Sequence, residues 1–503
     1  DMRNAFNTMR RDVLIRAARD RMPGLYHIAW QAYSQPSVLM YGREMISSAT
    51  GIQQGDPMGP ALFCLGVDDM VRSISSELNL WYLDDATMAG EVEDVARDLE
   101  TLIPGLMSIG LEINDRKCEA SFINHTDEQF VQSRDILSAH LPNVKVLPVN
   151  QLCLLGAALY GEAMVPTLHD KLEKLRAMSC RLALLDPHQA FILLKNCLAV
   201  PKLLYLLRTC ATYHYPEELG EIDKLIRETT STITNVQFDD VQWSQASLPV
   251  RDGGIGIRSV SDVALPAYIA SVHFTADVVE SILPIKIGFD LTADVGNAIR
   301  AWKASTGAEE LPSDLEKCKQ RAWDALGIGL RVTAMRESAD QISRARLLAA
   351  ACPESGLWLH AIPVPSLGTH LDAETLRMAV ALRVGALVSM PQPCRCGQLT
   401  DSLGHHALSC RFSAGRHPRH AALNDVIRRA LQSAGIPSIL EPVGLCRTDG
   451  GRPDGATVFP FRNGRCLLWD ATCVDAFAQS HIIGCALSAG SPAEHAENLK
   501  RNK

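Results

Sequence analysis

The stretch Trp81-Tyr-Leu-Asp-Asp-Ala-Thr87 decides which fold we expect for this chain. Two short apolar runs, 78–82 and 86–89, flank the adjacent aspartates, which predicts a β-hairpin with both carboxylates at its tip. Adjacent carboxylates repel each other unless a cation offsets their charge. The pair therefore indicates a site for a hard divalent cation such as Mg²⁺, which prefers carboxylate oxygens. Taken alone, an Asp-Asp pair is also a common surface turn.

The segments around this hairpin alternate between helix and strand patterns. An apolar run from Ala61 continues as a helix toward Ser75, and residues 91–109 have the spacing of an amphipathic helix. Two strand-like runs, 111–114 and 117–123, predict a second hairpin-like element. The order strand, helix, strand, strand, helix, strand is typical of a ferredoxin-like fold. We therefore expect an α+β protein with a ferredoxin-like N-terminal domain.

Length and composition set the broad class of the protein. A chain of 503 residues exceeds the size at which one hydrophobic core keeps growing, so we expect about two to four domains. Hydrophobic residues make up 47%, and no apolar run approaches the length of a membrane span. The first residues show no signal-peptide pattern, and the fifteen cysteines are scattered. We expect reduced thiols, no membrane partner and a nuclear or cytoplasmic, intracellular location.

The net charge of −8 argues mildly against nucleic-acid binding, because neutralising phosphates requires lysine and arginine. Binding needs only a local basic face, however. Three segments supply one: Arg10–Arg21, Arg411–Arg429 with His417 and His420, and Lys500–Lys503. Each segment can equally be the solvated face of a helix, so charge alone leaves nucleic acid open as a partner.

Four motifs follow one another in the N-terminal quarter of the chain. They are Asp1-Met-Arg-Asn-Ala-Phe6, Gly51-Ile-Gln-Gln-Gly-Asp-Pro-Met-Gly-Pro60, Tyr82-Leu-Asp-Asp85, and Gly110-Leu-Glu-Ile-Asn114 with Lys117-Cys-Glu119. In this order they resemble the successive palm motifs of reverse transcriptases, and they look most similar to those of non-LTR retrotransposons. The resemblance implies an RNA-directed DNA polymerase that extends a DNA primer on an RNA template with deoxynucleoside triphosphates.

The resemblance also assigns roles to individual residues. Asp1, Asp84 and Asp85 match the acids that bind two Mg²⁺ ions, which stabilise the attacking and leaving oxygens of phosphoryl transfer. Phe6 matches the gate that excludes a ribose 2′-hydroxyl, and Lys117 the lysine that assists the leaving pyrophosphate. A core aromatic and a surface lysine are the alternatives for these two. The loop that positions template and incoming nucleotide is matched by Gln54, Gly55, Asp56 and Pro57.

Motifs of the fingers, which precede the first acid in this family and supply basic residues to the nucleotide, do not precede Asp1. We therefore expect an N-terminally truncated chain. Two alternatives to an active polymerase follow. One is a catalytically inactive element relic that retains nucleic-acid binding, and the other is a free-standing zinc-dependent nuclease with a vestigial palm. Primer extension that depends on Asp84 distinguishes the polymerase from the other two, and DNA nicking that is abolished by Asp454→Ala distinguishes the nuclease.

A cluster of soft ligands begins in the last quarter of the chain. Three thiols and an imidazole suit tetrahedral Zn²⁺, and the residues are Cys394, Cys396, His405 and Cys410. His406 is adjacent, and we choose His405 because its spacing matches the Cys-Cys-His-Cys knuckle of site-specific non-LTR elements. With fifteen cysteines in the chain, an incidental cluster is the alternative.

Acids recur after the knuckle in a pattern that resembles the restriction-like endonuclease of those elements. Arg452-Pro-Asp454-Gly precedes a hydrophobic run that ends in Asp470, and Glu441, expected on the preceding helix, is an additional ligand for a separate Mg²⁺. Thr472 replaces the lysine expected after Asp470, so we consider a displaced Lys500. The Arg-Pro-Asp-Gly stretch alone is also typical of a β-turn. The pattern predicts a nuclease that nicks target DNA.

Proline-rich stretches near residues 362 and 391 mark boundaries before this C-terminal region, and 248–254 (Leu-Pro-Val-Arg-Asp-Gly-Gly) looks like a thumb segment. The predicted domains are a reverse transcriptase palm at 1–164, a helical thumb at 165–265, a helical linker region of unknown role at 266–389, a zinc knuckle at 390–415 and an α/β restriction-like nuclease domain at 416–503.

Overall fold

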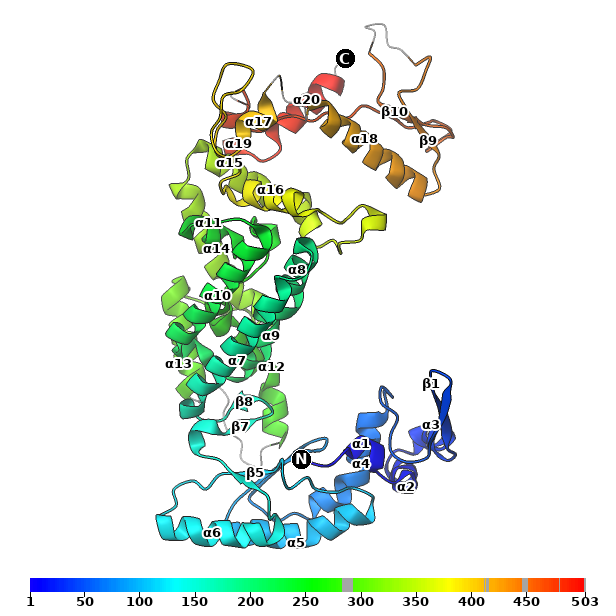
Figure 1. The fold of residues 1–503 in the computed structure, drawn as a ribbon, viewed down its shortest axis with the longest axis vertical. Helices are drawn as coiled ribbons and strands as arrows, with labels where there is room; N and C mark the ends of the chain where they lie inside the picture. The colour runs from blue at the N-terminus through cyan, green and yellow to red at the C-terminus, as the bar shows by residue number, and fades with distance from the viewer. Residues whose placement is uncertain (283–292, 411, 413–415, 446–450, 479, 502–503) are drawn as a thin grey trace. The chain divides into compact units, whose positions relative to one another are not determined.

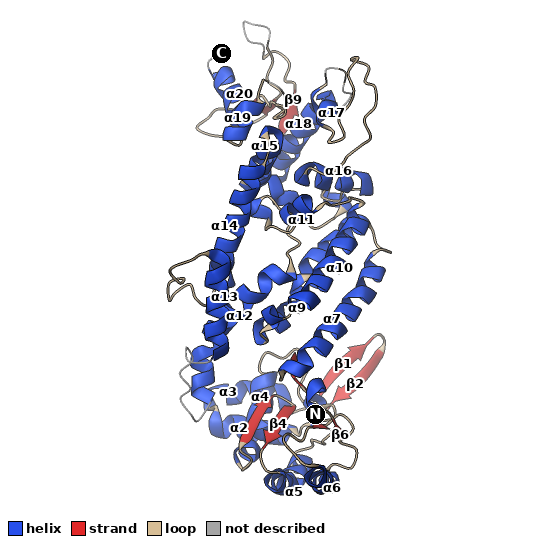
Figure 2. Ribbon diagram, turned by 90° about the vertical axis from the view of Figure 1, so that its left-hand side faces the viewer, coloured by secondary structure: helices blue, strands red, loops and turns tan. Residues whose placement is uncertain are grey.

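The computed structural model describes residues 1–282, 293–410, 412, 416–445, 451–478 and 480–501. The chain divides into two compact units, Asp1–Thr167 and Leu168–Lys503, which we describe separately. Helices dominate, and short strands occur in the first unit and near the C-terminus (Figure 1; Figure 2). The α+β class expected from the sequence is confirmed.

The first unit alternates helices with short strands. Its helices are α1 (Ala5–Thr8), α2 (Arg11–Arg21), α3 (Pro23–Tyr33), α4 (Gly59–Arg72), α5 (Val92–Ser108) and α6 (Asp127–His140). Its strands are β1 (Ser37–Tyr41), β2 (Glu44–Ser48), β3 (Leu78–Tyr82), β4 (Asp85–Ala89), β5 (Glu119–Ala120), β6 (Lys145–Val146), β7 (Cys153–Leu154) and β8 (Ala157–Ala158). Pro23 takes the first position of α3, where its missing N–H has no helical partner to lose, so α2 and α3 are separate helices.

The core of the first unit is formed largely by α1, α2, α4 and α5. Met9, Leu14 and Phe63 are almost fully buried in it. Leu102 and Leu106, four residues apart on α5, add one apolar face of that helix. Each fully buried side chain of this size contributes about 1.5–3 kcal/mol, so this core fixes the N-terminal motif against α4 and α5.

The strands of residues 1–167, all of which are described, pair two by two rather than in one ferredoxin-like sheet. The pair β3–β4 is antiparallel, whereas β5 pairs with β6 in parallel, and α6 forms the crossover. The second hairpin predicted at 111–123 is therefore wrong. The carbonyl groups of Cys118 and Ala120 accept from Lys145 and Leu147, which occupies the edge that a hairpin partner needs.

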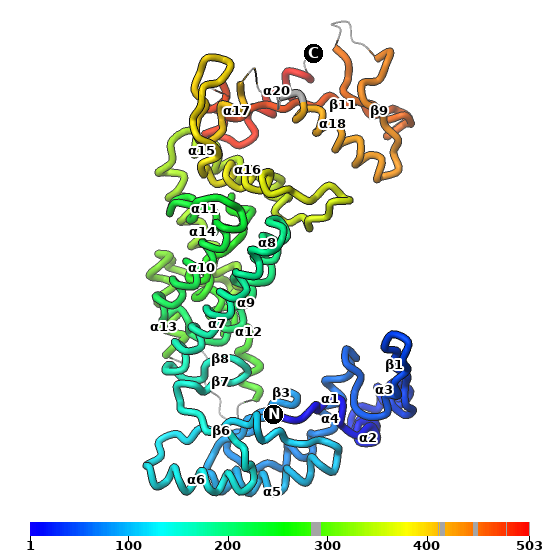
Figure 3. The backbone as a smooth tube through the Cα atoms, in the orientation of Figure 1, coloured from blue at the N-terminus to red at the C-terminus, as the bar shows by residue number. Residues whose placement is uncertain are grey.

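The second unit is mostly helical, and its path from α16 to α20 can be followed in Figure 3. The boundary between the units falls within α7 (Gly161–Leu182). The following helices are α8 (Pro187–Leu193), α9 (Val200–Thr209), α10 (Pro216–Thr234), α11 (Asp240–Ala246), α12 (Val260–Ile282), α13 (Ala293–Thr306), α14 (Gln320–Ser338), α15 (Gln341–Ala350), α16 (Ala373–Val384), α17 (His405–Ser409), α18 (Arg416–Ser433), α19 (Ile482–Leu487) and α20 (Ser491–Arg501). The strands are β9 (Ser438–Leu440), β10 (Gly455–Thr457) and β11 (Leu468–Trp469).

One stretch of the second unit, Pro187–Thr209, is long and apolar enough to cross a membrane, contrary to the expectation from the sequence. Buried core helices pass the same test, and α9 packs against α12. The stretch is also not one regular α-helix, because Leu194–Leu198 forms a π-helical turn. Leu203, Leu206 and Leu207 are buried, so this leucine face of α9 belongs to the core of the unit.

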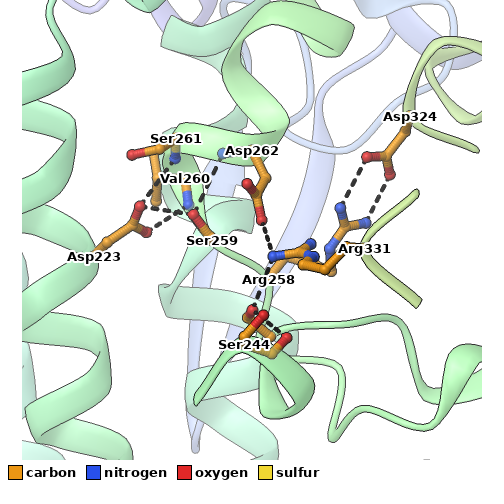
Figure 4. A network of polar contacts seen from close by, with 10 residues as sticks. Asp223, Ser244, Arg258, Ser259, Val260, Ser261, Asp262, Asp324 and Arg331 are labelled. Atoms are coloured by element: carbon orange, nitrogen blue, oxygen red, sulfur yellow. Dashed lines mark hydrogen bonds and ion pairs between the residues drawn. The ribbon is translucent and has the colours of Figure 1, made fainter. Parts of the chain in front are cut away.

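Polar contacts anchor the start of α12 (Figure 4). The Asp223 carboxylate accepts from two N–H groups at the first turn, at 2.6 and 3.1 Å, and from the Ser259 hydroxyl at 2.7 Å. Arg258 forms a bidentate ion pair with Asp324 of α14, at 2.7 and 2.9 Å. Helix α12 continues through residue 265, where the predicted thumb ends, so that boundary falls inside a helix.

A buried arginine of α16 holds the thumb-like segment 248–254. The Arg383 guanidinium donates at 2.9 Å to three backbone carbonyl groups, those of Val250, Gly254 and Ala350. Burial lowers the pKa of Arg383 to about 10. The guanidinium is still charged at neutral pH, because this value lies well above 7. Helix α16 belongs to the region for which no role was predicted, and its contact with the segment is structural support.

Replacing Arg383 with methionine should destabilise this part of the second unit, because buried carbonyl groups lose their donor. We expect the free energy of local opening to fall by about 3 kcal/mol or more, measured by native-state hydrogen exchange of the amides in α11 and α12. Arg251→Met is the control, since Arg251 is exposed and pairs with the neighbouring Asp252. Its effect should stay within about 0.5 kcal/mol, and equal exchange in both variants would contradict the role.

Candidate active sites

Asp84 and Asp85 lie at the tip of the β3–β4 hairpin, and the hairpin predicted here is confirmed. Tyr82 pairs with Asp85, so Leu83 and Asp84 form the two-residue turn. Leu83 has φ of 60°, the left-handed conformation that tight hairpin turns require at this position. Asp85 is exposed and Asp84 half-buried, so the turn holds both carboxylates where solvent and ions reach them.

Packing explains why a leucine occupies this turn. The left-handed conformation costs a residue with a β-carbon about 1–2 kcal/mol. Leu83, Trp81 and Met88 are half-buried and pack against the core of the first unit. Full burial of an aliphatic side chain contributes about 1.5–3 kcal/mol, which is comparable with the backbone cost. The turn thus combines a core contact with an exposed acid pair.

Backbone pairing with the segment after α5 places Asp1. The Asn114 N–H donates to the Asp1 carbonyl at 3.0 Å, and Met2 forms a bridge with Ile113. This pairing brings Lys117 to Asp1, with 3.5 Å between Nζ and Oδ2. Both side chains are accessible to solvent, and an exposed ion pair of this kind contributes at most about 1 kcal/mol, so either group can exchange its partner for a ligand.

The carboxylates of Asp1, Asp84 and Asp85 are not drawn into one tight cluster. Among the described residues, the group of three or more metal-ligand atoms within 4.8 Å of one another lies elsewhere, near the C-terminus. Carboxylates without a cation between them repel each other. Their oxygens are the hard donors that Mg²⁺ prefers, so the donor set fits the ion predicted from the sequence.

The loop predicted to position template and nucleotide is bonded to α1, the helix that carries Phe6. The Ile52 N–H donates to the Phe6 carbonyl at 2.6 Å. A Cβ on Gly51 would lie 2.3 Å from the Asn7 backbone, so only glycine allows this approach. The ring of Phe6 stacks on Phe63, with centroids 4.8 Å apart. The ring therefore serves the core, and its role as a steric gate stays a prediction.

The predicted loop residues differ in their contacts. Gln54, Gly55 and Pro57 are exposed, and Gly55 has φ of 88°, a conformation that favours glycine. Asp56 is half-buried and accepts a hydrogen bond from the Tyr33 hydroxyl and one at 2.9 Å from the N–H that precedes α4. Asp56 therefore shapes the loop, whereas Gln54 and Gly55 are open to a ligand.

Two residues that sequence reasoning missed support this loop. Arg11 is buried, and its guanidinium donates to the carbonyl groups of Gly51 at 2.9 Å and Ser48 at 2.7 Å. Burial and the hydrogen bond with Asp56 raise the pKa of Tyr33 to about 12, so its hydroxyl stays a donor at neutral pH. No sequence signal separates Arg11 from the other arginines of α2, because its partner lies 40 residues away.

The C-terminal cysteine cluster comes together with one change of ligand. Four ligand atoms lie within 4.8 Å of one another, those of Cys394, Cys396, His406 and Cys410. The structure corrects the predicted His405 to His406. Successive residues of a helix point in directions about 100° apart, and the ring of His405 stacks on Phe477 with centroids 4.3 Å apart. Only one of the adjacent histidines therefore reaches the thiols.

Distances and protonation in this cluster suit a metal. Cys394 Sγ lies 3.7 Å from Cys410 Sγ, and Cys396 Sγ lies 3.3 Å from His406 Nε2. Hydrogen bonds from the Cys396 N–H and the His406 ring lower the pKa of the Cys394 thiol to about 6, which makes it a thiolate at neutral pH. Three sulfur donors and one imidazole are a donor set of structural zinc sites, so these residues fit Zn²⁺.

Comparison with known proteins relates the palm motifs to one family. Residues 1–152 match the sequence model of the family described as reverse transcriptase (RNA-dependent DNA polymerase). The chain is 27% identical over 282 residues to a retrovirus-related Pol polyprotein from the type-1 retrotransposable element R2 of Popillia japonica, an alignment that covers 51% of this chain and 45% of the relative. The chain is thus similar to reverse transcriptases of retrotransposable elements.

A second relative extends the similarity into the C-terminal unit. The retrovirus-related Pol polyprotein from the type-2 retrotransposable element R2DM of Drosophila melanogaster is 24% identical over 455 residues, which covers 82% of this chain and 39% of that protein. The chain thus spans less than half the length of either curated relative.

In this retrotransposon-related chain, two of the predicted nuclease acids flank one strand pair. Strand β10 lies between β9 and β11 in an antiparallel sheet. Gly455 pairs with Trp469, so Asp454, just before β10, and Asp470, just after β11, are at the same end. A Cβ on Gly455 would lie 1.9 Å from the Trp469 ring. The Arg-Pro-Asp-Gly stretch therefore leads into a strand, and its glycine is needed for packing rather than for a β-turn.

Lys500, the lysine considered as a replacement in the sequence, lies beside Asp470. Lys500 Nζ lies 2.6 Å from Asp470 Oδ1 and 3.1 Å from the Ala471 carbonyl oxygen. Glu441, in contrast, follows strand β9 instead of lying on a helix, because 438–440 pair with β10. Its N–H donates to the Asp454 carbonyl at 2.9 Å and its side chain is exposed. Within the described part of the chain, the three acids do not form a ligand cluster.

His420, which the sequence placed only in a basic face, contacts Asp454. Its Nε2 lies 3.1 Å from Asp454 Oδ2, and its Nδ1 lies 3.4 Å from Asn424 Nδ2. Asn424 Oδ1 accepts from Trp469 Nε1 at 3.0 Å. The indole is only a donor, so it fixes the Asn424 amide, whose N–H then donates to Nδ1. Nε2 therefore carries the proton of neutral His420 and donates it toward Asp454.

Of the predicted basic faces, Arg411 with residues 413–415, and residues 502–503, lie outside the described residues. The segment Arg10–Arg21 is described in full and forms most of α2.

Zinc content should depend on His406 and not on His405. Removing one of four ligands should lower the Zn²⁺ of the purified protein from about one ion per chain to well below that value, measured by atomic absorption after dialysis against a weak chelator. His405→Ala is the matched control and should keep its zinc. Retention of zinc by His406→Ala, or equal loss in both variants, would contradict this ligand set.

Proposed function

We propose that this chain is the RNA-directed DNA polymerase region of a non-LTR retrotransposon protein, followed by a nuclease that nicks target DNA. The polymerase copies an RNA template from a primer 3′-hydroxyl with deoxynucleoside triphosphates. The observation that carries the proposal is the acid pair Asp84–Asp85, held in a left-handed turn within a region that matches the reverse transcriptase family.

The palm residues divide the work of phosphoryl transfer. Mg²⁺ ions, when held by Asp1, Asp84 and Asp85, offset the charge that develops on the attacking and leaving oxygens. The protein supplies position: the loop at 51–58 is fixed by hydrogen bonds and presents its exposed residues Gln54 and Gly55 to template and nucleotide. Lys117, 3.5 Å from Asp1, offers an exposed cation to the leaving pyrophosphate.

In the proposed nuclease, Asp454 and Asp470 are the residues that would hold a separate Mg²⁺, and the chemistry such an ion would supply is activation of water for phosphodiester hydrolysis. Lys500, kept 2.6 Å from Asp470, stabilises the charge of the attacked phosphate. His420 is a positioning residue, because its Nε2–H occupies Oδ2 of Asp454 and leaves Oδ1 for the ion. The zinc cluster has four ligands and no open position, so we assign it a structural role.

The second candidate function is that of a relic that binds nucleic acid without chemistry. The observation that favours it is the separation of the three palm carboxylates, which form no ligand cluster among the described residues. A bound cation is needed to bring them together, and the polymerase proposal requires that it does so.

Asp84→Asn should abolish Mg²⁺-dependent extension of a DNA primer on an RNA template, with a loss of about 100-fold or more, because a group that stabilises the transition state is removed. Extension is measured as labelled product length in a single-turnover assay. Asp69→Asn is the control, since Asp69 is an exposed acid of α4 that pairs with Arg21, and it should extend as the wild type does. If neither the wild type nor Asp84→Asn extends the primer, the polymerase proposal is contradicted and the relic is favoured.

Nicking of supercoiled DNA should require Asp454 and Lys500. Asp454→Asn and Lys500→Ala should each slow Mg²⁺-dependent conversion to open circles by about 100-fold or more. Arg501→Ala is the matched control, since Arg501 neighbours Lys500 on α20 and pairs with Glu497. We expect it to nick at the wild-type rate.

The same assay tests His420. His420→Ala should nick more slowly, and His420→Gln should recover part of the rate, because its amide N–H can replace Nε2–H as a donor to Asp454. Nicking by His420→Ala at the wild-type rate would remove the positioning role. Nicking by Asp454→Asn would remove the nuclease assignment itself.

A further inference from the structure

Helices α2 and α3 line most of an open surface hollow of about 350 Å³ within the first unit. This volume lies in the range of roughly 300–1,000 Å³ that is usual for small-ligand sites. The α2 side carries three arginines together with Asp12 and Ile15, and the α3 side is aromatic. The cationic residues are Arg11, Arg16 and Arg19, and the aromatic residues are Tyr26, Trp30 and Tyr33.

The aromatic residues of α3 are not all buried in the hydrophobic core. Tyr26, Trp30 and Tyr33 are four and three residues apart, so they share one face of α3. Tyr33 is buried at 2% exposure and forms the floor, whereas Trp30 is 52% exposed and Tyr26 half-buried. A stripe that served the core alone would be buried throughout. An exposed indole beside arginines is a surface on which a flat ring can stack.

The arginines of α2 also differ in exposure, since one is buried and two are exposed. Arg11 directs its donors to the backbone at Ser48 and Gly51. Arg16 and Arg19 are exposed, and their partners are Asp12 at 2.8 Å and Asp20 at 2.7 Å. Exposed ion pairs contribute at most about 1 kcal/mol, so a phosphate, which also forms bidentate bonds with guanidinium, can replace these carboxylates.

We propose that this hollow binds an unpaired nucleotide of a single-stranded nucleic acid. The base stacks on Trp30, and Arg16 and Arg19 bind the adjacent phosphate. The floor joins the hollow to the predicted substrate loop, because the Tyr33 hydroxyl donates to Asp56 and Arg11 holds Gly51. That the strand is the template rests on the proposed function, whereas the binding itself does not.

The test is the affinity of the full chain for a labelled uridine oligomer of about 20 nucleotides, longer than the roughly 4–16-nucleotide site sizes usual for such surfaces, measured by fluorescence anisotropy. Trp30→Ala should bind roughly 5- to 100-fold more weakly, the effect of losing one stacked base, while Trp30→Phe keeps most of the affinity. Because the Trp30 side chain is half in solvent, the substitution leaves no core cavity.

The salt dependence of the affinity distinguishes phosphate binding by the arginines from base stacking on Trp30. The double variant Arg16→Gln with Arg19→Gln should lower the slope of log affinity against log salt by about 0.7 for each phosphate that the protein no longer neutralises, whereas Trp30→Ala should leave the slope unchanged. Arg21→Gln is the control, because Arg21 lies on α2, pairs with Asp68 and does not line the hollow. It should change neither affinity nor slope.

The site itself is mapped by photo-crosslinking of an oligomer that carries 5-iodouridine. We expect adducts in the α3 peptide, at Tyr26 or Trp30. No binding by the wild type, unchanged affinity of Trp30→Ala, or adducts confined to other peptides would each overturn the proposal. Binding and crosslinking of the wild type are measured beside its primer extension. A failure of primer extension with this binding intact therefore counts against the polymerase and not against the hollow.

Discussion

Hydrogen bonding between short antiparallel strands sets where the acids of this protein lie. In β3–β4, the pairing of Tyr82 with Asp85 leaves a turn of two residues, so the positions of both aspartates follow from the register. In β10–β11, the pairing of Gly455 with Trp469 brings Asp454 and Asp470 to the same end. A slip of one residue would turn every side chain of a strand to the opposite face. Carboxylates that repel each other need such a scaffold, because no attraction of their own holds them near one another.

Two buried guanidinium groups tie these strands and loops to distant parts of their units. Arg11 holds the end of β2 and the loop after it, and Arg383 holds the thumb-like segment through three carbonyl oxygens. Each guanidinium donates the hydrogen bonds that these carbonyl groups would otherwise accept from water, so the loop at Gly51 and the segment 248–254 keep their shape outside the sheets. Helix α2 uses its two sides differently: Arg11 supports the loop from within, and Arg16 and Arg19 remain at the surface.

In the C-terminal unit, aromatic contacts lie beside the cysteine cluster and, separately, beside the acid pair. The ring of His405 stacks on Phe477, and Trp469 both packs on Gly455 and orients Asn424 toward His420. The indole N–H thus fixes a chain of hydrogen bonds that ends on Asp454. Trp469 therefore serves both the packing of the strand pair and the orientation of Asp454.

By itself, the sequence determined those features that depend on near neighbours. The alternation around Asp84 and Asp85 fixed the hairpin, and motif order fixed the relationship to reverse transcriptases. The spacing of Cys394, Cys396 and Cys410 identified the metal cluster, because a few intervening residues can reach only so far.

Tertiary structure alone decided what depends on distant partners. It selected His406 over His405 through the contact with Phe477, and it brought Lys500 to Asp470 across 30 residues. It also joined β5 to β6 where a local hairpin was expected. Neighbouring residues set the backbone preference of a segment and the distance that it can span. The direction of a side chain and the choice of a strand partner depend instead on packing between segments that are distant in the sequence.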